Sequence, residues 1–240
     1  KRSTVIWPFG AVEQHGPHLP LATDSIFVDS IINEVFNLLP EDLPLKKIPT
    51  QFIGFSPEHK GFDGTITLSS KLINLMIIEV GKQLADMGFK RLVLFNAHGG
   101  QISLLNTAAR ELRLSAPELA VMPCFLWSGV DGLDKFLTRS ELANGLHASF
   151  AETSLMMSIR PELVGKERPC EGISENIPNG WSLEGDAPTA WFTKDISNSG
   201  VIGDSRGASA EIGDELKNKL INHWYQMLLG LMSSDWPNIN

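Results

Sequence analysis

The spacing of apolar residues changes repeatedly along the first 160 residues, from short continuous runs to runs with helical periodicity. Short apolar runs bounded by Gly, Pro or Asn are typical of buried strands, whereas apolar residues three or four positions apart are typical of helices. The strands predicted in this way cover residues 4–7, 45–53, 91–96 and 119–127. The predicted helices cover residues 24–39, 70–87, 101–114 and 148–160. We expect Asp24 or Ser25 to cap the first of these helices.

Strands and helices that alternate at this spacing predict an α/β fold. A strand, a helix and a parallel strand form a right-handed unit, and several such units build a parallel sheet with helices on both faces. We therefore expect a three-layer αβα architecture with a mainly parallel central sheet. Residues 1–240 are interpreted as a single domain, because no composition change marks a boundary.

The later part of the chain has a less regular pattern. Residues 134–146 are predicted to form a helix or a lid, and residues 208–232 a long closing helix. Residues 162–204 are rich in Gly, Pro, Asn and Ser, and we interpret them as loops and short strands that cover a site. Trp181 lies in a polar part of this segment, so it is the best tryptophan for a substrate-contacting wall, although tryptophans are more often core residues.

Composition and charge narrow the classes of function. The hydrophobic content of 42% and charged content of 20% are those of an ordinary globular protein, and the net charge of −8 argues against nucleic-acid binding. Apolar stretches such as residues 72–80 are too short to cross a bilayer. The two cysteines, Cys124 and Cys170, form no CxxC pair. We therefore expect neither a thiolate zinc site nor a disulfide framework, and we expect a reducing cytoplasm.

The loop after the first predicted strand carries a concentration of metal-binding residue types. Glu13, His15, His18 and Asp24 fall within residues 7–24, on a path that contains three prolines and two glycines. Imidazole and carboxylate groups are the ligands that zinc, manganese and iron share in proteins. This loop is therefore predicted to supply half of a two-metal hydrolytic centre.

Other histidines are predicted to reach the same place. His59 and His98 follow predicted strands, and His147 precedes the predicted helix that carries Glu152. The carboxyl ends of parallel strands meet at one edge of a sheet, where ligands bind. Each residue alone has a simpler interpretation as a solvated carboxylate, a helix cap or a packing histidine. The set favours a metal site, because only His223 of the six histidines lies in a plain amphipathic helix.

Several stretches together resemble the creatininase (creatinine amidohydrolase) family. The most specific is EQHGPHLP at residues 13–20 followed by Thr23-Asp24. Four further stretches agree, and they are EH at 58–59 with DGT at 63–65, NAHGG at 96–100, HASFAETS at 147–154 and GVIGD at 200–204. The resemblance covers almost the whole chain.

This resemblance implies a creatininase-like domain with two metal ions that hydrolyses carbon–nitrogen bonds in cyclic or small amides. By position, Glu13, Asp24 and His98 would hold one ion. His15 would hold the second, with Asp24 bridging and a further carboxylate completing the site. His147 would transfer protons.

The sequence departs from creatininase proper directly after His98. In that enzyme a Tyr-Glu pair follows, and its Glu is a metal ligand, whereas this chain has Gly99-Gly100. Glu152 is the available replacement, both as a ligand and as a catalytic carboxylate. The Gly-Gly form is shared with branches that act on formamides of flavin or deazaflavin pathways or on the mycofactocin peptide. The residues expected to contact substrate are His59, Trp181, Gly99 and Gly100.

The predicted function is hydrolysis of a cyclic amide, creatinine or a related compound, by a metal-bound hydroxide. His147 then passes a proton to the leaving nitrogen. The expected cofactors are two divalent ions per chain, zinc or manganese, with iron as a further candidate. His18 and His59 are expected to lie outside the ligand set. The partners expected are a small amide substrate and further copies of the chain, in a hexamer by family resemblance.

Two rival classes fit the sequence less well. A two-metal phosphohydrolase needs cationic side chains near the site, and only Lys60 and Arg160 lie near these motifs. A non-catalytic metal-binding scaffold is disfavoured because the ligand set and His147 are both intact.

Overall fold

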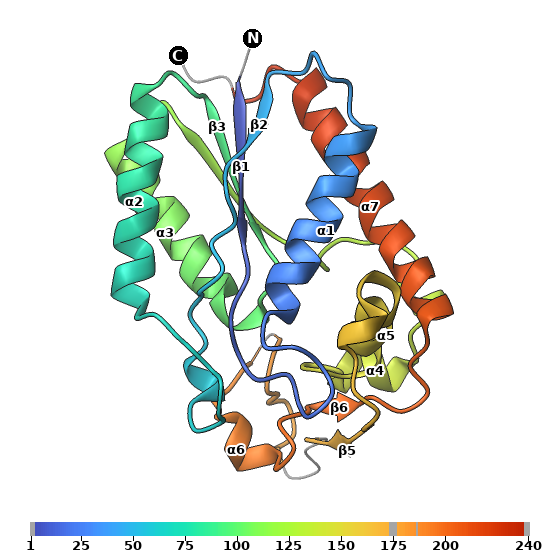
Figure 1. Ribbon diagram of the computed structural model, residues 1–240. Helices are drawn as coiled ribbons and strands as arrows, with labels where there is room; N and C mark the ends of the chain where they lie inside the picture. The colour runs from blue at the N-terminus through green and yellow to red at the C-terminus, as the bar shows by residue number, and fades with distance from the viewer. Residues whose placement is uncertain (1–2, 173–176, 186, 238–240) are drawn as a thin grey trace.

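The computed structural model describes residues 3–172, 177–185 and 187–237. At its centre is a parallel four-stranded sheet in the order β2-β1-β3-β4 (Figure 1). The strands are β1 (Thr4–Phe9), β2 (Leu45–Lys47), β3 (Arg91–Asn96) and β4 (Ala120–Phe125). Helices α2 (Ser70–Asp86) and α3 (Ile102–Ser115) cover one face, and α1 (Thr23–Leu38) and α7 (Ala210–Ser233) cover the other. The predicted three-layer α/β fold with a mainly parallel sheet is confirmed.

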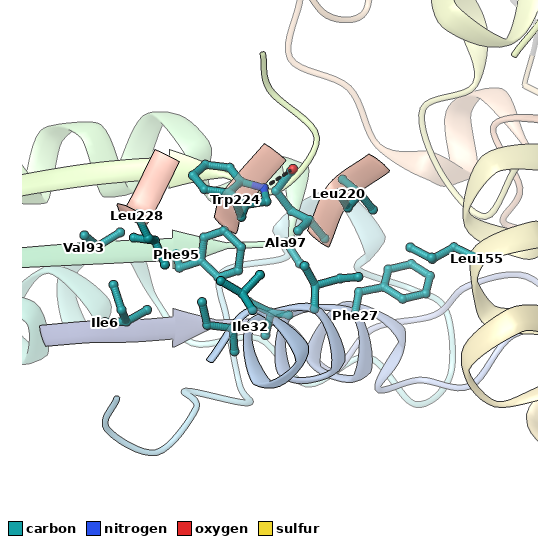
Figure 2. Packing of buried hydrophobic residues seen from close by; sticks show 14 of the residues in the cluster. Ile6, Phe27, Ile32, Val93, Phe95, Ala97, Leu155, Leu220, Trp224 and Leu228 are labelled. Carbon is teal, nitrogen blue, oxygen red and sulfur yellow. Dashed lines mark hydrogen bonds between the residues drawn. The ribbon is translucent and has the colours of Figure 1, made fainter. Parts of the chain in front are cut away.

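Strand β1 is buried on both faces because helices cover both. Successive side chains of a strand point to opposite faces. Ile6 therefore packs in the core with α1 and α7, whereas Trp7 packs in the core with α2 and α3. In the first core, the rings of Phe95 and Trp224 lie edge to face, with centroids 4.8 Å apart (Figure 2). The indole N–H of Trp224 donates to the carbonyl of Leu126 at 2.8 Å, so α7 is also tied to the segment after β4.

The second strand is shorter than the predicted 45–53. Regular pairing with β1 covers Leu45–Lys47 only, and the parallel contact returns as a single bridge between Phe9 and Gln51. Pro49 lies between these two places, and it lacks the N–H that a ladder requires. The prediction was therefore correct in position and too long in extent.

The predicted cap of the first helix was wrong. Helix α1 begins at Thr23, its N-cap is Ala22, and no side chain caps it. Asp24 and Ser25 lie inside the first turn and are buried. The carboxylate of Asp24 is consequently free of a capping role and available to the site.

The remaining elements gather beyond the carboxyl ends of the strands (Figure 1). They are α4 (Arg139–Asn144), α5 (Phe150–Ile159), α6 (Thr193–Ile196), β5 (Cys170–Glu171) and β6 (Gly203–Asp204). The described residues also contain four 3₁₀ turns. Two of them, η1 (Pro57–His59) and η2 (Gly99–Gln101), follow β2 and β3, whereas η3 (Leu133–Lys135) precedes α4 and η4 (Pro161–Leu163) follows α5.

The two less regular predicted segments are resolved into short pieces. Residues 134–146 do not form one helix, because the 3₁₀ turn η3 and the short helix α4 are separate elements. Residues 162–204 form loops with the small antiparallel pair β5–β6 and the one-turn helix α6. Residues 173–176 and 186 of this segment lie outside the described residues. Within the described ranges, no helix combines the length and apolarity needed to cross a membrane.

Candidate metal centre

The site is built on loops that leave β1 and β3 side by side. These strands are paired in register through Phe9 and Asn96, so the chain segments that follow begin next to each other. The amide of Gln101 joins them, donating to the carbonyl of Gly10 at 3.1 Å and to Asn96 Oδ1 at 2.9 Å. Asn96 Oδ1 also accepts from the backbone N–H of His98 at 2.9 Å. The backbone that presents His98 is therefore held from both sides.

Four histidines surround one oxygen of Glu13. Its Oε1 lies 3.2 Å from His98 Nδ1, 3.3 Å from His59 Nε2, 3.8 Å from His147 Nδ1 and 4.0 Å from His15 Nε2. All five side chains are buried. They come from three loops and the segment before α5, so residues far apart in the sequence meet at one point.

Asp24 connects two of these histidines. Its Oδ1 lies 3.6 Å from His15 Nε2, and its Oδ2 lies 3.5 Å from His98 Nδ1. Glu152, in the first turn of α5, completes a second group with His15 and Asp24, in which all ligand atoms lie within 4.8 Å of one another. Glu13, Asp24 and His98 form another such group. Asp24 is therefore shared between two sets of candidate ligands.

Unsatisfied polar atoms mark the point where the two groups meet. Both carboxylate oxygens of Glu13, Nε2 of His15 and Oδ2 of Asp24 are buried and make no well-formed hydrogen bond in the described part of the chain. A buried polar atom without a partner costs about 1–3 kcal/mol. Nitrogen and oxygen atoms in this mixture suit zinc, manganese or iron, so the residues fit divalent cations.

The charges within the cluster compensate one another. Burial raises the pKa of Glu13, but the electrostatic influence of His98 and His59 and their side-chain hydrogen bonds outweigh it and hold that pKa well below its usual 4.5. Burial lowers the pKa of His15, but Asp24 and then Glu152 raise it to about 9. Protons on the imidazoles thus take the place that a cation would occupy beside these carboxylates.

The pKa values of Glu152 and His147 are both shifted in the direction that favours the neutral side chain. Burial raises the pKa of Glu152 to about 7, against the opposing effect of His15. Its Oε2 accepts from the backbone N–H of Ala148 at 2.6 Å. Burial, with the neighbouring His59 and His15, lowers the pKa of His147 well below 6.5. His147 is therefore a neutral imidazole at pH 7.

The tautomer of His147 follows from its contacts. Its Nε2 lies 2.7 Å from the carbonyl of Gln14, which can only accept, so Nε2 carries the proton. Nδ1 is then the unprotonated nitrogen, and it faces Glu13. A neutral imidazole with a lone pair directed into the cluster can accept a proton.

The structure brings together Glu13, His15, Asp24, His98, His147 and Glu152, and it also brings His59 into contact with Glu13. His18 faces away, since its Nε2 lies 2.8 Å from Thr153 Oγ1. His59 Nδ1 lies 2.8 Å from both the Gln14 amide and Thr193 Oγ1.

Trp191, rather than the expected Trp181, lies beside a histidine of the cluster. Trp181 is 59% exposed and lines a separate cavity of about 310 Å³ with residues of α4. The ring of Trp191 instead meets His59 edge to face, with centroids 6.5 Å apart. Trp181 was the expected substrate contact because it lies in a polar segment, whereas Trp191 was given no role in substrate binding.

Glu58 is a site residue that sequence reasoning left without a role. Its Oε1 lies 3.2 Å from His98 Nε2, and its carboxylate forms a further candidate group with Glu13 and His59. The available signal was its position directly before His59 in a predicted site loop.

Comparison with known proteins gives one family. The family model for creatininase, described as creatinine amidohydrolase, matches residues 1–228. The chain is 30% identical over 227 residues to a mycofactocin precursor peptide peptidase of Mycolicibacterium smegmatis, covering 91% of this chain and 81% of that protein. A solved manganese creatininase has a TM-score of 0.76 at 21% identity, covering 97% and 92% of the two chains. A mutant creatininase of zinc–zinc type has a TM-score of 0.75 at 20% identity with the same coverage.

Proposed function

The chain belongs to the creatininase (creatinine amidohydrolase) family, and from this premise we propose that its buried cluster is the two-metal centre of an amidohydrolase. The family and its relatives identify a hydrolase of carbon–nitrogen bonds. The observation that carries the assignment to this cluster is the convergence of buried, unpartnered ligand atoms from Glu13, His15 and Asp24.

In this proposal two sets of residues hold two ions. Glu13, Asp24 and His98 hold one, and His15, Asp24 and Glu152 hold the other. The manganese and zinc creatininases of the same fold support these two metals, and iron suits the same donors. Two divalent ions bound here would polarise the amide carbonyl and lower the pKa of water to about 7.

His147 supplies the proton transfer. Its Nε2–H is engaged by the carbonyl of Gln14, so Nδ1 is the atom that takes a proton from the attacking water. The same atom then delivers that proton to the leaving nitrogen, so the carbon–nitrogen bond breaks without forming an amide anion. Such general acid–base catalysis contributes roughly 10²–10⁴-fold to the rate. Glu152, with a pKa of about 7, is the second catalytic residue of the proposal, after His147.

The first substrate class is a cyclic amide, as the family of creatinine amidohydrolases suggests. His59, Gly99 and Gly100 are the proposed substrate contacts, whereas Trp181 lines the separate cavity described above. A short peptide is the second candidate, favoured by the 30% identity to a peptide peptidase over most of both chains. A formamide is the third class that the Gly-Gly form of the motif suggests. A cytoplasmic homo-oligomer, a hexamer by family resemblance, belongs to the same proposal.

One experiment tests the centre and the role of His147 together. Wild-type protein loaded with zinc or manganese is expected to contain two ions per chain and to hydrolyse a member of a panel of creatinine, cyclic imides, formamides and short peptides. His147→Ala should keep both ions while its kcat falls roughly 10²–10⁴-fold. His98→Ala should lose metal and activity together.

Elemental analysis and steady-state kinetics provide the two readouts. Full metal content in His98→Ala would remove it from the ligand set, and unchanged turnover in His147→Ala would remove its catalytic role. If only the peptides are hydrolysed, a short peptide replaces the cyclic amide as the proposed substrate class.

A further inference from the structure

Among the described residues, Glu58 is the one carboxylate of the candidate ligand groups to which the proposed function gives no task. It lies in η1, and its side chain is 13% exposed. Its Oε1 is 3.2 Å from Nε2 of His98, a proposed metal ligand. The other candidate carboxylates, Glu13 and Asp24, lie near Nδ1 of the same ring. Glu58 and the proposed ion site therefore contact different nitrogens of His98.

Gly100 makes room for this contact. A Cβ at position 100 would lie 1.7 Å from Glu58 Oε1 and 2.7 Å from His98 Nε2, so no side chain fits there while both groups stay in place. A Cβ on the neighbouring Gly99 would meet no atom within 4 Å. Only the second glycine of the pair is sterically required, and the carboxylate of Glu58 fills the space it leaves.

The surroundings of His98 decide which nitrogen would keep its proton when a metal ion binds. Nε2 lies 3.0 Å from the carbonyl of Phe55 and 3.2 Å from Glu58 Oε1, and it is also 3.3 Å from Ser56 Oγ. The carbonyl of Phe55 can only accept, so Nε2 carries a proton. Nδ1, which faces Glu13 and Asp24, is then the nitrogen that would exchange its proton for a metal ion.

We propose that Glu58 is a positioning residue that holds the Nε2–H side of His98 and thereby aims Nδ1 at the metal, in the space that Gly100 leaves open. The inference rests on the proposed function, since it assumes that His98 binds an ion. Metal-binding histidines commonly donate their second N–H to a carboxylate, which fixes the ring and raises its basicity. Loss of such a partner typically costs 10–100-fold in metal affinity.

The test is the zinc affinity of the full chain, measured by competition with a chromogenic chelator. Glu58→Ala should bind zinc about 10–100-fold more weakly than wild type. Glu58→Gln should recover most of the affinity, because its amide oxygen still accepts from Nε2. The matched control is Asp63→Asn, which removes an exposed carboxylate from the same loop and should bind zinc as wild type does.

A second pair of variants tests the contact between Glu58 and His98 through the glycines beside it. Gly100→Ala should lower zinc affinity, because its methyl group displaces the Glu58 carboxylate and crowds His98. Gly99→Ala changes the adjacent glycine in the same way but meets no neighbour, so it should keep the affinity.

The outcomes separate this inference from the proposed function. Wild-type zinc binding combined with equally tight binding by Glu58→Ala overturns the positioning role alone. Equal losses in Glu58→Gln and Glu58→Ala also overturn it, since they indicate that Glu58 is itself a metal ligand. Absence of zinc binding by the wild-type chain overturns the proposed function and this inference together.

Discussion

At the scale of single residues, two buried histidines of the same loop differ widely in the pKa of their imidazoles. His15, beside Asp24 and Glu152, has a pKa of about 9. His18, which burial and Arg168 disfavour as a cation, has a pKa of about 4. Both are buried imidazoles three positions apart, so the difference comes from the carboxylates and cations around them. The histidine beside carboxylates is the one proposed as a ligand.

Metal binding is expected to depend on pH because a cation and a proton compete for the same lone pair. The pKa of His15 is about 9, so below pH 9 a metal ion must displace a proton from this imidazole, which weakens metal binding. His15 alone should make zinc affinity rise about tenfold per pH unit between pH 7 and 9. Chelator competition at several pH values, corrected for titration of the chelator, measures this slope. A flat profile over that range would contradict ligation by His15.

At the scale of elements, helix α5 owes its position to close packing on α7. Gly213 of α7 lies so near α5 that a Cβ there would be 1.9 Å from the carbonyl oxygen of Ser154. Glu152 and Thr153 stand on the same helix α5, and Thr153 contacts His18. The helix pair thus links the hydrophobic core to the candidate metal centre.

This packing predicts opposite effects for two Gly→Ala changes in one helix. Gly213→Ala should lower the free energy of unfolding by about 1–3 kcal/mol, the usual cost of overpacking. Gly230→Ala, where a Cβ would meet nothing within 4 Å, should raise it by up to about 1 kcal/mol through helix propensity. Urea unfolding of the metal-free variants measures both. A Gly213→Ala protein as stable as wild type would show that the two helices can separate without cost.

At the scale of the whole molecule, bound metal would join parts of the chain that otherwise touch through loops. The proposed ligands extend from Glu13, after β1, to Glu152 in α5, and their carboxylates repel one another when no cation is present. Burial and the charge of Glu13 raise the pKa of Asp24, which is a direct sign of this repulsion. Folding and metal binding should therefore be coupled.

Removal of metal is expected to destabilise the folded protein. Free zinc at about 100 times its Kd should add about 2.7 kcal/mol to the free energy of unfolding, because the ion binds the folded state. Scanning calorimetry with zinc and with excess EDTA should therefore give a lower Tm in EDTA. His98→Ala is the control, and its Tm should respond much less. Coincident curves for metal-loaded and metal-free wild type would contradict the coupling.

The layered fold could be predicted because it follows from local periodicity. Burial on both faces requires continuous apolar runs such as β3, and burial of one face requires the helical spacing found in α2 and α3. The predicted length of the second strand was wrong because Pro49, shortly after β2, interrupts regular pairing within the predicted range 45–53. The cap of α1 was missed because the preference of Asp for N-caps competes with its use as a buried ligand candidate.

The sequence by itself determined the fold class, the family and the set of chemical groups that the site contains, since motifs such as EQHGPHLP keep those groups close along the chain. Only the tertiary structure decided which atoms face one another. It directs Nδ1 of His98 to Glu13 and its Nε2 to Glu58, and it brings Trp191 to His59. These contacts join residues 40 or more positions apart across irregular loops. No local periodicity constrains such loops, so their packing against one another sets the geometry.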